Sequence, residues 1–167
     1  AEVCQQADLP PGVVNIVPGP SDIGMHLVSH PGVDKVALTG STGVEKLIHK
    51  AIAGTDKAIT LELGGKAANI VFEDAALDQA VEGIVNGIYF NQGEVCCAGS
   101  RLLVQESVAS PLIEKLKDRL STIRVGDPLD KNTDVGAINS KNQLETITAL
   151  VQSGIDEGAE MYQPACD

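Results

Sequence analysis

Short apolar runs alternate with longer stretches of helical periodicity along most of the chain. The short runs are β-branched or aliphatic, as buried strands are, and they cover residues 13–17, 35–39, 58–63, 68–72 and 101–105. Between them, residues 43–53 have a helical pattern that ends at Gly54. Because strands that alternate with helices form parallel sheets, we predict an α/β fold.

Two later segments carry an apolar stripe along one helical face. The stripes consist of Leu77, Val81, Ile84, Val85 and Ile88, and of Leu112, Ile113, Leu116, Leu120 and Ile123. Ser110 and Pro111 have the residue types of an N-cap and a first helical position. Ser140 predicts the start of a further helix and Gly154 its end. Residues 126–136 are rich in Gly, Asp, Asn and Pro and predict a loop.

Composition and charge restrict the function. Aromatic residues make up 2% of the chain and the formal net charge is −11, so we expect no nucleic-acid partner, since few rings can stack on bases and phosphates would be repelled. No apolar run reaches the ~18 residues of a membrane span, and nothing resembles a signal peptide. We therefore expect a cytoplasmic protein without a membrane partner. The 167 residues suffice for one ordinary domain but are few for a two-domain enzyme.

The four cysteines form neither a CxxC pair nor a metal-ligand spacing, so we predict no metal site and no disulfide framework. They are Cys4, Cys96, Cys97 and Cys166. The adjacent pair lies in the polar segment FNQGEVCCAG, where a thiol can be reached and can act as a nucleophile once deprotonated. Buried cysteine is, however, commonly a small hydrophobe. These residues alone leave open whether Cys96 or Cys97 reacts.

Glu62 is a candidate general base at the end of the apolar strand in LELGGK. A carboxylate in this position is expected to be partly buried, which raises its pKa toward that of a useful base. The two glycines that follow allow backbone to approach a flat ligand closely. The alternative is a solvated or ion-paired residue at the strand end, with Lys66 as its partner.

A tight turn at Gly40 and Ser41 joins a predicted strand to a predicted helix in LTGSTGVEKL. Free N–H groups and partial positive charge at a helix N-terminus suit a phosphate of a nucleotide cofactor. The turn also has a structural interpretation, because Thr42 and Glu45 have the spacing of a capping box. Taken alone, the turn favours the structural interpretation.

The chain resembles the aldehyde dehydrogenase superfamily in three segments that occur in the family's order, LTGST, LELGGK and FNQGEVCCAGSR. The stretches PPGVVNIVPG, VDKVALTGS and VGDPLD are also similar to the family. Several motifs in the family's order are far more specific than any single one, and the resemblance extends through nearly all of the chain. It implies NAD(P)-dependent oxidation of a small-molecule aldehyde to a carboxylic acid.

The resemblance implies a role for each matching residue. Counting back from AGSR, Cys96 is the nucleophile and Cys97 is packed behind it, while Glu62 is the general base that activates water. Gly40 and Ser41 match the turn that binds a cofactor phosphate, and Leu63 and Gly64 match backbone near the nicotinamide of NAD or NADP. The presence of Glu62 favours hydrolysis of the thioester. The alternative is transfer of the acyl group to coenzyme A, as in acyl-CoA-forming semialdehyde dehydrogenases.

Glu45 is a departure, because the family turn commonly reads G-S-T-x-x-G and has glycine there. A carboxylate near a pyrophosphate would weaken binding, and we expect the capping box to direct it away. This departure supports a competing class, a non-catalytic scaffold of the same fold. A third class is a Ser-His-Asp hydrolase using one of three histidines, but no G-x-S-x-G elbow occurs. These are His26, His30 and His49.

The resemblance also implies a domain organisation. Residues 1–64 would be the C-terminal part of a Rossmann-like NAD(P)-binding domain, and residues 65–167 the start of a catalytic domain. The ends of the sequence lead us to expect an internal fragment of a longer protein. We expect that full-length protein to be a homo-oligomer.

Overall fold

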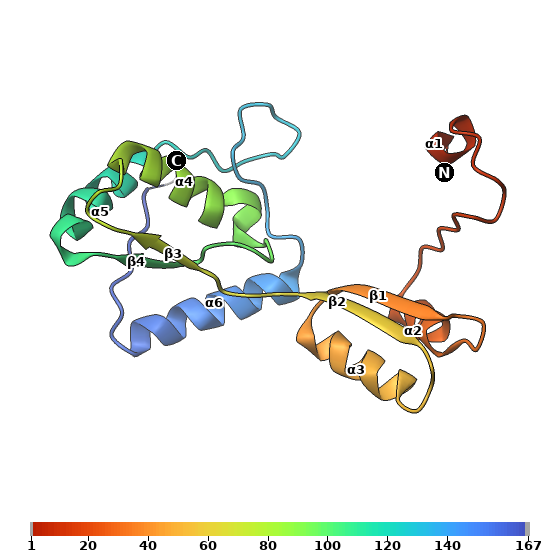
Figure 1. Cartoon of the computed structure of the whole chain (residues 1–167). Coiled ribbons are helices and arrows are strands. Elements are labelled where there is room, and N and C mark those ends of the chain that lie inside the picture. Colours follow the sequence, from red (N-terminus) through yellow and green to blue (C-terminus); the bar gives the residue numbers. More distant parts are fainter. Residues whose placement is uncertain (1, 166–167) are drawn as a thin grey trace. The chain divides into compact units, whose positions relative to one another are not determined.

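The computed structural model describes residues 2–165 and has an α/β architecture that divides into two compact units, one up to Leu63 and one from Gly64 onward (Figure 1). The predicted fold class is confirmed. Each unit contains one sheet of two parallel strands.

In the first unit, two parallel strands are covered on one face by helices. Its elements are α1 (Glu2–Gln6), α2 (Ser21–Ser29), β1 (Lys35–Gly40), α3 (Thr42–Ile52) and β2 (Ala58–Leu63). Alternating side chains of β1 and β2 point to opposite faces, and one face packs on α2 and α3. The buried residues of this core are Val28, Val36, Ile48 and Ile52.

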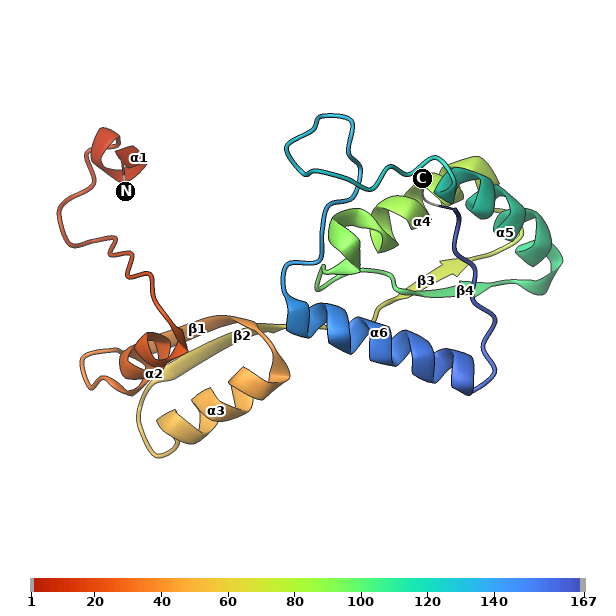
Figure 2. The same cartoon turned by 180° about the vertical axis from the view of Figure 1, so that it is seen from behind.

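In the second unit, a sheet and two helices enclose the core. Its elements are β3 (Ala68–Val71), α4 (Leu77–Ile88), the 3₁₀ helix η1 (Phe90–Gly93), β4 (Arg101–Val104), α5 (Glu106–Leu120) and α6 (Lys141–Asp156). Figures 1 and 2 show α4 and α5 on one side of β3 and β4, and α6 on the other. The core consists of Val71, Val81, Ile84 and Leu112, which come from β3, α4 and α5.

Four of the five predicted strands are confirmed, and the fifth, at residues 13–17, is wrong. That segment begins with a bend and has no strand pairing, and its apolar side chains are exposed, with Val13 at 62% and Ile16 at 70%. A short β-branched run becomes a strand only beside a neighbour that completes its hydrogen bonds. Residues 126–136 form the predicted loop.

The two last predicted helices are present, but the end of α6 and the start of α5 differ from the prediction. Ser140 is the N-cap of α6 as predicted, since its Oγ accepts a hydrogen bond from the Gln143 N–H at 3.2 Å. The predicted end at Gly154 is wrong, because α6 continues to Asp156 and the left-handed residue that follows is Gly158, with φ of 91°.

The start of α5 is also earlier than predicted. Gln105 is its N-cap, and Pro111 lies inside the helix instead of at its first position. Contacts with Glu73 support the extra turn: its backbone N–H donates to Gln105 Oε1 at 3.1 Å, and Ser107 Oγ donates to its Oε2 at 3.0 Å. Tertiary contacts have therefore overridden the local signal at Ser110.

Candidate functional site

Four of the predicted site residues meet at the carboxyl end of the first sheet. In the parallel register of β1 and β2, Thr39 lies opposite Glu62 and Gly40 lies opposite Leu63. Ser41 follows Gly40 directly and begins the turn into α3. The carboxyl ends of parallel strands are where α/β proteins bind ligands, so the register brings the proposed phosphate turn and the proposed base to one edge.

The turn into α3 is capped by Ser41, and the predicted capping box of Thr42 and Glu45 is wrong. Ser41 has extended backbone angles, and its Oγ accepts a hydrogen bond from the Val44 N–H at 3.4 Å. Thr42 is already the first helical residue. Ser41 is therefore the N-cap, because the helix begins at the residue after it.

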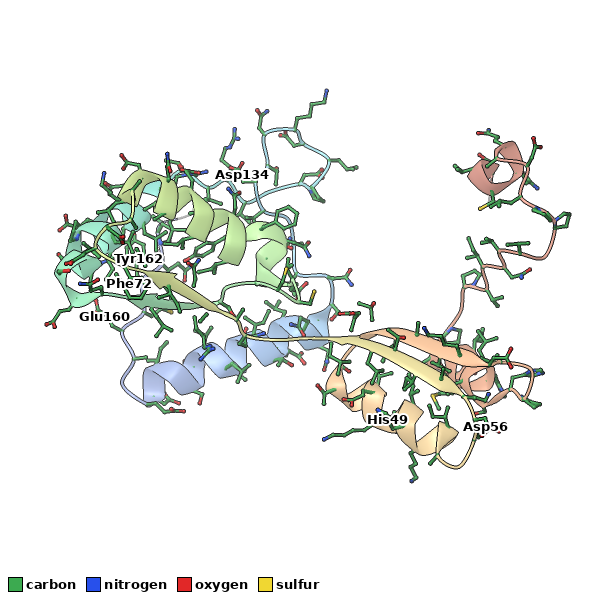
Figure 3. The ribbon with its side chains drawn as sticks, viewed as in Figure 1. His49, Asp56, Phe72, Asp134, Glu160 and Tyr162 are labelled. Carbon is green, nitrogen blue, oxygen red and sulfur yellow. The ribbon has the colours of Figure 1, made fainter. Side chains whose placement is uncertain are left out.

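Glu45 is directed along α3 and not back to its start. Its Oε1 lies 3.6 Å from Nε2 of His49, one turn further along the helix; Figure 3 labels His49. The carboxylate thus turns away from the helix N-terminus, as expected, but through a different partner.

The residues at the start of α3 fit a phosphate group. Gly40 and Gly43 are exposed and flank Ser41 and Thr42, so no side chain covers the backbone at these two positions. The first N–H groups of a helix have no partner within the helix and point toward its N-terminal end. Gly43 was not among the predicted site residues, although its position in the first turn of the helix could have indicated that it lies beside a bound phosphate.

Glu62 is exposed, so the expected partial burial is wrong for this chain. In β2 the exposed residues alternate with half-buried ones, and Glu62 shares the exposed face with Thr60. Leu63, the next residue, is half-buried on the opposite face.

In the second unit, Cys96 and Cys97 occupy a turn between η1 and β4, and both are exposed. The expectation that Cys97 is packed is therefore wrong. The Ala98 N–H closes the turn by donating to the Val95 carbonyl at 3.0 Å, and Ala98 itself is buried. The turn is fixed by its backbone and by the alanine that follows, while both thiols are left accessible.

Glycines allow neighbouring backbone to approach this turn. A β-carbon at Gly65 would lie 3.4 Å from the carbonyl oxygen of Cys96, so the second glycine of LELGGK lies against the cysteine turn. The Gly99 N–H donates to the Gly87 carbonyl at 3.1 Å, which ties the turn to α4. A β-carbon at Gly99 would meet the Asn69 side chain at 3.1 Å.

Three consecutive residues before the turn have left-handed backbone conformations. Their φ angles are 50° at Asn91, 58° at Gln92 and 75° at Gly93. Asn91 stabilises the bend twice, since its Nδ2 donates to the Glu94 carbonyl at 3.1 Å and its carbonyl accepts from the Glu94 N–H at 2.9 Å. The sequence predicted a polar turn here but not this strained geometry.

A pocket of about 450 Å³ lies beside the cysteine segment. Gln92, Gly93 and Ser100 contribute to its wall, together with Tyr89 and Tyr162. Burial raises the pKa of the Tyr89 hydroxyl above its usual value of 10.0. The volume is in the range of small-molecule sites.

Neither a metal site nor a membrane-spanning helix is found in the part of the chain that the structure describes. Within residues 2–165, no group of three or more His, Cys, Asp or Glu side chains is arranged to hold a metal ion. Over the same residues, no helix combines the length and apolar character needed to cross a membrane. His30 serves its own loop, since its Nδ1 accepts a hydrogen bond from the Gly32 N–H at 3.1 Å. Cys166 lies outside the described residues.

A family model described as the aldehyde dehydrogenase family matches residues 1–165. The chain belongs to this family. It is 48% identical over 159 residues to retinal dehydrogenase 2 of Taeniopygia guttata, a match that covers 94% of this chain and 31% of that protein. It is also 47% identical over 161 residues to an aldehyde dehydrogenase of Davidiella tassiana, covering 95% of this chain and 32% of that protein.

Solved aldehyde dehydrogenases have the same fold. An NAD-dependent aldehyde dehydrogenase from Sinorhizobium meliloti matches with a TM-score of 0.93 and 43% identity, over 98% of this chain and 33% of that one. A betaine aldehyde dehydrogenase from Staphylococcus aureus, solved in complex with NAD+, matches with a TM-score of 0.90 and 36% identity, over 97% of this chain and 32% of that one. The chain thus spans about a third of the length of these aldehyde dehydrogenases.

Proposed function

We propose that the protein to which this chain belongs oxidises an aldehyde to a carboxylic acid with NAD or NADP, using Cys96 as nucleophile and Glu62 as base. The observation that carries the proposal is the exposed Cys96 on a glycine-supported turn in a chain of the aldehyde dehydrogenase family. A nucleophilic thiol must be accessible to its substrate and held in a defined place. The turn at Cys96 meets both requirements.

Cys96 would begin the reaction as a thiolate that attacks the aldehyde carbon and forms a thiohemiacetal. The backbone N–H of Cys96 would stabilise the resulting oxyanion, because a fixed donor pays no reorganisation cost when the charge develops. When bound, the dinucleotide supplies the hydride acceptor that converts this adduct to a thioester. Cys96 then carries the acyl group until water removes it.

Glu62 would release the acyl group by taking a proton from a water molecule as that water attacks the thioester carbonyl. The C–S bond breaks, which frees the carboxylic acid and returns Cys96 as a thiolate. Because a water-activating base would waste a thioester intended for coenzyme A, Glu62 favours hydrolysis over acyl transfer.

The cofactor would bind at the carboxyl end of the first sheet. Gly40, Ser41 and the first turn of α3 would hold a phosphate, and backbone at Leu63 and Gly64 would lie near the nicotinamide. Support comes from the accessible N-terminus of α3 and from the NAD+ complex of the Staphylococcus aureus relative. Glu45 does not oppose this binding mode, since its carboxylate faces His49.

The full-length protein would act in the cytoplasm on a small aldehyde and form a homo-oligomer. The 167 residues have a net charge of −11, which would repel phosphate groups, so we expect no nucleic-acid partner.

The decisive experiment compares the two adjacent thiols in the full-length protein. We expect Cys96→Ser to abolish aldehyde-dependent NAD(P)H formation and Cys97→Ser to retain most of it, because only one thiol is the nucleophile. Peptide mass spectrometry after limited iodoacetamide treatment should show faster alkylation of Cys96 than of Cys97, in parallel with loss of activity. Activity of Cys96→Ser equal to that of an active wild type would refute the mechanism. A full-length wild type with no aldehyde-dependent NAD(P)H formation would instead favour the scaffold interpretation.

A further inference from the structure

Gln92 joins the segment that leads into the cysteine turn to a loop distant in sequence. Its Nε2 donates a hydrogen bond to the Ala137 carbonyl at 3.3 Å. A β-carbon at Gly136 would lie 3.3 Å from the same nitrogen, so the glycine leaves room for the amide. Gln92 is half-buried and Ala137 is exposed, so the bond itself lies at the surface.

The loop that provides the acceptor is itself held firmly. Asp134 accepts two hydrogen bonds at Oδ2 from Arg124, one from its backbone N–H at 3.0 Å and one from its Nε at 3.2 Å. The Arg124 carbonyl accepts from the N–H groups of Asp134 and Val135, at 2.9 and 3.1 Å. Figure 3 labels Asp134 in this loop. These bonds restrain the chain up to Val135, two residues before the Ala137 carbonyl.

On the other side, Gln92 needs an anchor because its backbone is left-handed, with φ of 58°. Residues other than glycine adopt this conformation only where the surroundings impose it. Gln92 precedes Cys96 by four residues. A change at Gln92 would therefore alter the direction in which the chain enters the cysteine turn.

We propose that Gln92 is a positioning residue for Cys96, and that its amide fixes the cysteine turn to the Ala137 loop in the orientation required for attack on the aldehyde. This inference rests on the proposed function, in which Cys96 is the nucleophile. Gln92 touches neither substrate nor the reacting sulfur in this role. It acts through the backbone between Gln92 and Cys96.

The test uses three variants of the full-length protein. Gln92→Glu keeps the size of the side chain and removes the N–H donor. Gln92→Gly also removes the donor but accepts the left-handed backbone without strain. Gln143→Glu makes the same chemical change on the exposed surface of α6 and serves as the matched control. For each variant, peptide mass spectrometry after iodoacetamide treatment gives the number of reactive Cys96 sites separately from Cys97, and steady-state kinetics give the turnover per site and the KM for the aldehyde.

We expect Gln92→Glu and Gln92→Gly to keep the number of reactive sites and the KM, while turnover per site falls by roughly tenfold to a hundredfold, because small displacements of a reacting group have effects of this size. Gln143→Glu should match the wild type. Unchanged turnover per site in Gln92→Glu would overturn the inference, as would fewer reactive sites with normal turnover per site, which indicates a purely structural role. Full turnover in Gln92→Gly would also overturn it, since backbone conformation alone would then suffice. Activity that survives Cys96→Ser would refute the proposed function and this inference together.

Discussion

Cys96 and Glu62 are presented to solvent by different means. Cys96 is held by backbone contacts, with glycines at positions 65 and 99 that permit close approach of neighbouring groups. Glu62 is presented by the alternation of side chains along β2. Substitution of either side chain should therefore change chemistry with little effect on the fold, which makes both residues suitable for kinetic tests.

Replacement of Glu62 by Gln should separate the two halves of the proposed reaction. Hydride transfer precedes the step that needs the base, so the first turnover should still produce one equivalent of NAD(P)H per site in a stopped-flow experiment. Steady-state turnover should fall by roughly 10²- to 10⁴-fold, the usual contribution of a general base.

Glu114→Gln is a matched control for this prediction, because Glu114 is an exposed glutamate on α5. It should leave both phases unchanged. An equal loss of the burst and the steady state in Glu62→Gln would contradict a role confined to hydrolysis.

At the scale of single residues, the sequence led to a prediction of which groups carry chemistry, but it predicted their surroundings poorly. The reactivity of thiol and carboxylate made the cysteine pair and Glu62 candidates, and the family resemblance chose Cys96 from the pair. The left-handed backbone of Asn91 and Gln92 was not predicted, since neither residue type requires this conformation and the side-chain bonds to Glu94 and Ala137 that accompany it have no signal in the sequence.

The loop between α5 and α6 provides a prediction that depends on pH. Hydrogen bonds from the backbone N–H and side chain of Arg124 lower the pKa of Asp134 below its usual 3.8. A carboxyl group whose pKa is lowered by folding stabilises the native state at pH values above its unfolded pKa, and this contribution is lost as the pH falls through the folded pKa.

Asp134→Asn should therefore lower the melting temperature at pH 7, and the difference from wild type should shrink as the pH falls below about 4. Thermal unfolding followed by circular dichroism between pH 7 and the lowest pH at which the protein remains folded measures this. Asp130→Asn in the same loop is a useful comparison. The hydrogen bonds to the Asp130 carboxylate come from Asn132 and not from an arginine. A constant difference across the pH range would show that the Arg124 interaction does not depend on the charge of Asp134.

Helices and paired strands were predicted from periodicity because each buries an apolar stripe or face against its own unit. The failures occurred where tertiary contacts decide the outcome. Val13 and Ile16 have strand-forming side chains but no neighbouring strand in the described chain. The start of α5 was displaced by the contacts of Gln105 and Ser107 with Glu73.

At the scale of the whole molecule, we expect the proposed activity to need more protein than these residues provide. The chain spans about a third of the length of its relatives. We predict that residues 1–167 alone show no aldehyde-dependent NADH formation in a spectrophotometric assay at any aldehyde concentration. The full-length protein measured under the same conditions is the control. NADH formation by the isolated residues would contradict this prediction.

The parallel register of β1 and β2 constrains how this segment can vary. Glu62 and Leu63 are adjacent in the chain but belong to opposite faces of the sheet. Removing a single residue anywhere in 58–61 would exchange these two faces, burying the carboxylate among the helices and exposing the leucine. In a library of variants, substitutions between Ala58 and Leu61 should therefore often survive, whereas single-codon deletions there should be eliminated.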